Sequence, residues 1–232
     1  MPKAIFFDAV GTLFGVRGSV GAVYAQIAAE FAVTAAPDRL QQAFFRAFGA
    51  ASPMAFPGCP PAEVATQENR WWRAIAETTF AEAGVLADFA DFEEFWARLY
   101  GHFATADPWE VYPDTHPVLA RWRRQGVTLG IISNFDSRLQ PVLAALDLAP
   151  YFDTVVYSTA VGAAKPDPRI FAAALGDWPA SECWHVGDSY QADVVGATAA
   201  GLQAFWLDRG AIAPAPFQVC GMSPNQPTFS KS

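Results

Sequence analysis

The feature that most limits the possible folds of this sequence is a series of short apolar runs separated by helical patterns. Five runs predict strands: Ala4–Phe7, Val127–Ile132, Thr154–Tyr157, Cys183–Val186 and Gln203–Leu207. These runs are apolar almost without interruption, which is typical of strands covered on both faces of a sheet. Four helical patterns lie between the runs: Thr115–Gln125, Ser137–Leu146, Pro168–Leu175 and Gln191–Ala200. Strands that alternate with helices predict an α/β fold with a parallel sheet.

A long insertion separates the first predicted strand from the second. Most of it follows a helical period, with apolar residues gathered on one face of each segment. Phe44, Phe45 and Phe48, for example, are predicted to share such a face. We therefore predict an α/β core of residues 1–14 and 111–210, a helical insertion of residues 15–110, and an irregular Pro-rich tail of residues 211–232.

Composition excludes several classes of protein. Of the 232 residues, 52% are hydrophobic and 16% are charged, so the chain can bury a large core. The formal net charge of −8 is spread along the sequence, which argues against nucleic acid as a partner. There is no run of about 18 apolar residues to span a membrane. The three cysteines are widely separated and odd in number, which indicates free thiols in a reducing compartment and not a disulfide framework. We expect a cytoplasmic protein, monomeric or homodimeric, that binds neither nucleic acid nor membrane.

Polar side chains follow three of the predicted strands at the point where each strand ends. Asp8 follows the first strand, Ser133 and Asn134 follow the second, and Asp188 follows the fourth. Such strand ends carry the functional groups of a parallel sheet. An aspartate there can attack phosphorus or carbon, and a serine with the N–H groups of its turn can hold anionic oxygens. Taken alone, each of these residues is also typical of a turn or a helix cap, which is the alternative interpretation.

A cation and a further carboxylate complete this set. Asp193 lies about one helical turn after Asp188, and together with Asp8 these carboxylates suit a magnesium ion that bridges a phosphate. Lys165 is one of three lysines in the chain, and the two prolines that follow it closely, Pro166 and Pro168, restrict its direction. A solvated surface position is the alternative interpretation of this lysine.

The motifs and their order resemble the haloacid dehalogenase-like hydrolase superfamily, in the branch with a helical cap between the first motif and the second strand. The resemblance covers residues 1–209 and is carried by four segments: Asp8-Ala9-Val10-Gly11-Thr12-Leu13, Ser133-Asn134-Phe135-Asp136, Lys165-Pro166-Asp167-Pro168, and Gly187-Asp188 with Asp193. It implies a Rossmann-like core, a cap formed by the helical insertion, and hydrolysis of a small phosphorylated substrate.

The resemblance also implies roles for individual residues. Asp8 would be the nucleophile, with Ser133 and Lys165 holding the transferred group. The implied ligands of Mg²⁺ are Asp8, Asp188 and the backbone carbonyl of Val10, with Asp193 supporting them. For substrate binding we expect Asn134, Thr12 and Arg17, the last because it lies just after the first motif. Arg70 and Arg73, with Glu68 and Glu77 nearby, predict a solvated helix face instead.

Val10 departs from the pattern of the phosphatases in this superfamily. They carry a second aspartate at this position, which protonates the leaving group and then activates the hydrolytic water. Such acid–base help contributes about 10²–10⁴ in rate, and valine offers none. Because the metal would take a main-chain oxygen here, the change should spare magnesium binding and affect the leaving group.

Three interpretations of Val10 remain. The first is a Mg²⁺-dependent phosphohydrolase that is limited to good leaving groups or is weakly active. The second is a binding or regulatory protein on a hydrolase scaffold. The third, less favoured, is a 2-haloacid dehalogenase, because such enzymes dispense with magnesium whereas this chain keeps Gly187-Asp188 and Asp193.

Overall fold

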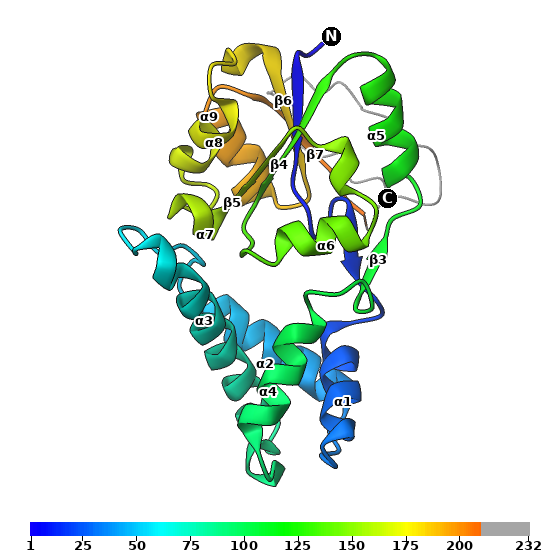
Figure 1. Cartoon of the computed structure of the whole chain (residues 1–232), viewed down its shortest axis with the longest axis vertical. Coiled ribbons are helices and arrows are strands. Elements are labelled where there is room, and N and C mark those ends of the chain that lie inside the picture. Colours follow the sequence, from blue (N-terminus) through cyan, green and yellow to red (C-terminus); the bar gives the residue numbers. More distant parts are fainter. Residues whose placement is uncertain (210–232) are drawn as a thin grey trace, which may run out of the picture.

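A parallel five-stranded sheet forms the centre of the computed structural model, which describes residues 1–209 (Figure 1). Its strands are β1 (Ala4–Phe7), β4 (Thr128–Ser133), β5 (Thr154–Tyr157), β6 (Cys183–Gly187) and β7 (Gln203–Trp206). They lie in the order β5-β4-β1-β6-β7, and each neighbouring pair is parallel. The predicted α/β fold is confirmed, and the predicted strands differ from the observed ones by at most one residue at either end.

β1 is the central strand, and the order of strands reverses beside it. After β1 the chain forms β4 and β5 on one side and then β6 and β7 on the other. Phe7, the last residue of β1, pairs with Ile131 of β4 and Val186 of β6, so the three strands end close together. Ligands of open parallel sheets bind beyond the carboxyl ends of the strands at such a reversal. Asp8 lies at this point.

Hydrophobic clusters on both faces of the sheet explain why its strands are continuously apolar. Ile5 and Phe7 join a cluster with α5 (Thr115–Arg124) and α6 (Leu139–Ala145). Ala4 and Phe6 point to the other face and join a cluster with α8 (Pro168–Leu175) and α9 (Gly196–Ala199). Figure 1 shows α5 on one side of the sheet and α8 and α9 on the other. A short helix, α7 (Ser158–Val161), follows β5.

Four helices lie beyond the carboxyl ends of the strands (Figure 1). They are α1 (Val20–Glu30), α2 (Pro37–Ala50), α3 (Pro61–Glu82) and α4 (Phe92–His102), and we refer to them together as the cap. Ser19 and Asp91 cap the first and last of these helices, and prolines begin the other two. The cap has its own core, which includes Tyr24, Ile27, Leu40, Phe80 and Phe95.

The two chain connections between the sheet and the cap form a small antiparallel sheet. β2 (Phe14–Val16) pairs with β3 (Trp109–Val111), with Gly15 opposite Glu110. Each strand is only three residues long, too short to give a periodic pattern, and neither was predicted. The pair brings together the residues at which the predicted insertion begins and ends.

Two local predictions differ from the structure. The single helix predicted over Gln191–Ala200 is divided into a π-helical turn, Tyr190–Val195, and α9. The wide turn accompanies Asp193, whose side chain is buried and reaches back to β6. Of the three phenylalanines predicted to share a face of α2, Phe44 alone is buried in the cap core. Phe45 is 60% exposed, because adjacent residues of a helix point about 100° apart. The predicted tail 211–232 lies outside the described residues.

None of the helices within residues 1–209 combines the length and the apolar character that crossing a membrane requires.

Candidate active site

Asp8 lies directly after β1 and is almost completely buried. Its backbone N–H donates to the carbonyl of Val186 over 2.8 Å. Its Oδ1 accepts hydrogen bonds from the hydroxyl of Ser133 (3.1 Å) and the ammonium of Lys165 (2.7 Å). Within residues 1–209 its second carboxylate oxygen accepts no hydrogen bond. Burial raises the pKa of Asp8, and Lys165 acts in the opposite direction.

Lys165 joins two carboxylates in the interior. Its Nζ lies 2.7 Å from Oδ1 of Asp8 and 2.6 Å from Oδ1 of Asp193. Burial acts to lower the pKa of Lys165, but the two carboxylates outweigh burial and raise it. The lysine is therefore a fixed positive charge and not a solvated surface residue.

The amide of Asn134 fixes the backbone of Lys165 from both sides. Asn134 Nδ2 donates to the carbonyl of Lys165 (3.0 Å), and Asn134 Oδ1 accepts from its N–H (2.6 Å). Asn134 thus positions the lysine, a contact that its place after β4 did not reveal.

Asp193 is surrounded by hydrogen-bond donors. Oδ1 accepts from Lys165 and lies 2.8 Å from Nε2 of His185, while Oδ2 accepts from the N–H of Ser189 (3.0 Å). Burial opposes ionisation, but the hydrogen bond from His185 and the charge of Lys165 hold the pKa of Asp193 below its usual range. His185 is buried, as its place in the β6 run predicts, and burial lowers its pKa. Its contact with Asp193 was not predicted.

Three carboxylates form a compact acidic group. Asp8, Asp188 and Asp193 each offer an oxygen, and these oxygens lie within 4.8 Å of one another. Asp188 is the exposed member, and partial burial of its carboxyl with the charges of Asp8 and Asp193 raises its pKa to about 6. A single lysine does not balance three carboxylates at this separation. An oxygen-ligand set with uncompensated negative charge fits a magnesium ion.

Two glycines let the backbone approach these carboxylates closely. Gly11 has φ +92°, and a Cβ built there would lie 2.4 Å from Oδ2 of Asp188. A Cβ on Gly187 would lie 2.1 Å from Cγ of Asp193. Any side chain at either position would displace a carboxylate, which explains why glycine occupies both.

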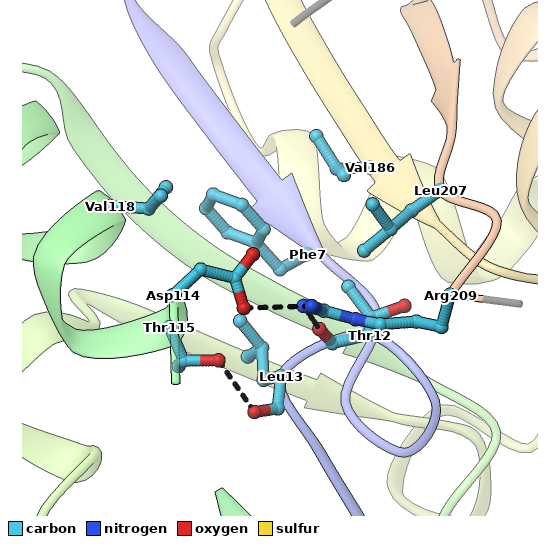
Figure 2. Close-up of a pocket in the computed structure, with 9 residues that line it drawn as sticks. All are labelled: Phe7, Thr12, Leu13, Asp114, Thr115, Val118, Val186, Leu207 and Arg209. Atoms are coloured by element: carbon cyan, nitrogen blue, oxygen red, sulfur yellow. Dashed lines mark hydrogen bonds and ion pairs between the residues drawn. The ribbon is translucent and has the colours of Figure 1, made fainter. Parts of the chain in front are cut away.

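The loop after Asp8 is also held by residues outside the acidic group (Figure 2). The guanidinium of Arg209 donates to the carbonyl of Thr12 (2.5 Å) and to Asp114 (2.7 Å), and it lies over the ring of Tyr112. The hydroxyl of Thr115 donates to the carbonyl of Leu13 over 2.6 Å. A small pocket lies between these contacts, and its lining includes Phe7, Val118, Val186 and Leu207.

The remaining predicted residues lie around this loop. Thr12 is buried, and its hydroxyl has no partner among the described residues. Val10 is partly buried and packs against the core cluster on one face of the sheet. Arg17 is exposed, and its guanidinium donates to the backbone carbonyls of Asp107 and Trp109. In the described part of the chain it makes no hydrogen bond to the carboxylates.

Comparison with known proteins agrees with this arrangement. A sequence model of the haloacid dehalogenase-like hydrolase family matches residues 2–201. The chain belongs to this family. Haloacid dehalogenase-like hydrolase domain-containing protein 3 of Bos taurus is 35% identical over 205 residues, which are 88% of this chain and 80% of that protein.

Two solved structures of the family show the same fold. A HAD phosphatase from Thermococcus onnurineus has a TM-score of 0.57 and 26% identity, over 91% of this chain and 88% of that one. The L-2-haloacid dehalogenase from Xanthobacter autotrophicus has a TM-score of 0.63 and 24% identity, over 91% and 80%. A phosphatase and a dehalogenase share this HAD fold, so the side chains must decide between the two reactions.

Proposed function

We propose that this protein is a Mg²⁺-dependent phosphohydrolase that acts on small phosphorylated molecules with good leaving groups. One observation carries the proposal: Asp8 presents a carboxylate oxygen that accepts no hydrogen bond from residues 1–209, beside Lys165, Ser133 and two further carboxylates. Asp8, Asp188 and the carbonyl of Val10 would hold the metal, with Asp193 behind them. When bound, the metal would neutralise charge on the transferring phosphoryl group.

Asp8 would attack phosphorus through its free oxygen. A bond forms between that oxygen and phosphorus, the bond to the leaving oxygen breaks, and its electron pair stays with the leaving group. Ser133 and Lys165 hold the other oxygen of Asp8, which keeps the carboxylate oriented for attack. Water then attacks phosphorus, Asp8 leaves as a carboxylate, and the proton passes to solvent.

Val10 determines which substrates can react. Its hydrocarbon side chain can neither protonate a departing alkoxide nor accept a proton from water. An acyl phosphate releases a carboxylate, which needs no proton, so that class of substrate suits the site. Glu68 of the cap does not replace the missing acid, because its two oxygens already accept hydrogen bonds from Ser137 and Thr159.

Dehalogenation is disfavoured by the acidic group. Asp8 needs a free oxygen for attack on carbon, which the site offers, but that reaction has no use for a cation held by Asp188 and Asp193. Three carboxylates within 4.8 Å are costly to maintain without such a cation.

Covalent trapping tests the proposed function. Because Val10 cannot activate water, hydrolysis of the phosphorylated enzyme should be slower than its formation. With acetyl phosphate and Mg²⁺ we expect a burst of about one acetate per protein, then slow turnover. Acid-quenched protein should carry a phosphoryl group on the peptide that contains Asp8. Absence of both the burst and the label, in a protein that binds Mg²⁺, would instead favour a binding role.

Removal of one ligand charge provides a second prediction. Because the folded-state pKa of Asp188 is raised to about 6 from 3.8, ionisation of Asp188 begins to destabilise the metal-free protein above about pH 4, and the loss is complete above about pH 6. Asp188→Asn should therefore stabilise it at pH 7 by about 1 kcal/mol after solvent screening, or roughly 2–4 °C in Tm. This gain should vanish below about pH 4, where both forms are neutral.

Asp188→Asn should stabilise the metal-free protein but should weaken the stabilisation that Mg²⁺ provides. Mg²⁺ should raise the Tm of the wild type at pH 7, less so at pH 5 where protons compete, and hardly at all in Asp188→Asn. Asp38→Asn, at an exposed cap position, is the control. Equal Mg²⁺ stabilisation of wild type and Asp188→Asn would remove Asp188 from the metal site.

A further inference from the structure

Glu68 of α3 is fully buried although it is a charged residue of the cap. Its Oε1 accepts hydrogen bonds from the N–H of Ser137 (3.0 Å) and the hydroxyl of Thr159 (2.5 Å). Its Oε2 accepts from the hydroxyl of Ser137 (2.5 Å). A carboxylate leaves water at a high cost unless hydrogen bonds replace its solvation. Here the α/β core supplies all three donors: two belong to Ser137, in the loop after β4, and one belongs to Thr159, in α7.

A second contact lies one turn further along α3. Residues four apart share a helix face, and Trp72 faces the core as Glu68 does. The indole N–H of Trp72 donates to Oδ2 of Asp136 over 2.6 Å. Arg138 binds both oxygens of the same Asp136, and its guanidinium lies 3.9 Å from the ring centre of Tyr100 on α4. Two cap helices therefore contact one segment of the core, residues 133–138, which we call loop 133–138 and which starts at the last residue of β4.

That loop is also part of the candidate active site. Its first residues face the catalytic groups, since Ser133 donates to Asp8 and Asn134 holds both backbone groups of Lys165. Its next residues face the cap, since Asp136 and Ser137 bind α3. Only Phe135 separates the two sets, so a shift of one set must be carried by very few backbone torsions.

We propose that loop 133–138 couples the cap to the catalytic groups, with Glu68 as the positioning residue. Docking of Glu68 on Ser137 and Thr159 holds the loop in the conformation that places Asn134 on Lys165. The docking stands on the contacts alone, and its consequence for turnover rests on the proposed function.

Residue-resolved amide hydrogen exchange tests the coupling without any need for activity. In Glu68→Ala we expect exchange at least about 10-fold faster in α3 and at the N–H of Lys165, which donates to Asn134. Exchange in α5, on the far side of the core, should not change. Glu63→Ala is the matched control, because Glu63 is exposed on the first turn of the same helix.

Glu68→Gln should restore the wild-type pattern. Its carbonyl oxygen can accept from the N–H of Ser137 and from Thr159, and the Ser137 hydroxyl can turn to accept from the amide. If Glu68→Ala does not fold, Thr159→Val removes one donor and should give the same pattern at smaller size. Faster exchange in α3 with an unchanged N–H of Lys165 would overturn the coupling, as would unchanged exchange in α3. Failure of the proposed function would appear separately: the variants would show these changes in exchange while the wild-type protein released no phosphate from acetyl phosphate.

Discussion

Asp8→Asn should abolish magnesium-dependent phosphate release, with a fall in kcat of at least about 10³-fold. The amide is a poor nucleophile and cannot form the covalent intermediate, although it keeps the size of the carboxylate. Release of phosphate from acetyl phosphate, followed with and without Mg²⁺, measures the effect. Because the carbonyl oxygen of the introduced amide can still accept from Ser133 and Lys165, the variant should remain folded, as circular dichroism can verify.

The control for this substitution is Asp38→Asn, which makes the same chemical change at an exposed position of the cap. It should leave kcat unchanged. Retention of more than about a tenth of wild-type turnover in Asp8→Asn would mean that Asp8 is not the nucleophile.

Val10→Asp should have a large effect in the opposite direction. It supplies a carboxyl group two residues after Asp8, where it can protonate a leaving alkoxide and activate water. We expect kcat/KM for an alkyl phosphate to rise by about 10²-fold or more, and the burst with acetyl phosphate to disappear as the second step accelerates. Stopped-flow and steady-state assays of both substrates measure the two effects.

Val10→Asn is the matched control for the gain of function. Asparagine has nearly the size and shape of aspartate, but its amide does not act as an acid or a base near neutral pH. It should remain as slow as wild type with the alkyl phosphate. Equal gains in both variants would trace the effect to polarity and not to acid–base chemistry.

Much of the site was predictable because parallel strands collect their carboxyl ends at one edge. Asp8, Ser133 and Asp188 each follow an apolar run, and the sheet brings them together as that pattern predicts. The environment of Lys165 cannot be predicted in this way, because its sequence neighbours restrict its backbone direction but do not determine the burial of its ammonium. Only the structure shows that two carboxylates surround it.

The cap contacts could not be predicted by the same reasoning. Glu68 lies between polar residues on α3, and the spacing of Arg70 and Arg73, with acidic residues nearby, predicts a solvated face. Arg73 does pair with Glu77 at the helix surface, but Glu68 is buried against the core. Its three donors come from residues 69 and 91 positions away in the sequence. Periodicity describes one helix at a time and carries no information about such partners.

His185 was missed for a related reason. A histidine inside an apolar strand predicts burial, which the structure shows, but its hydrogen bond to Asp193 depends on the π-helical turn after β6. That turn is rare, and helical periodicity predicts an ordinary helix in its place.

A phosphohydrolase that lacks an acid at position 10 should be selective for the leaving group. The most direct test compares kcat/KM for acetyl phosphate with kcat/KM for ethyl phosphate, at saturating Mg²⁺ and with Asp8→Asn as background. We expect the wild type to prefer acetyl phosphate by at least about 10²-fold, the size of the missing acid–base contribution, and we expect this preference to shrink in Val10→Asp. Comparable values for the two substrates in the wild type would contradict it, because some other group would then be protonating the alkoxide.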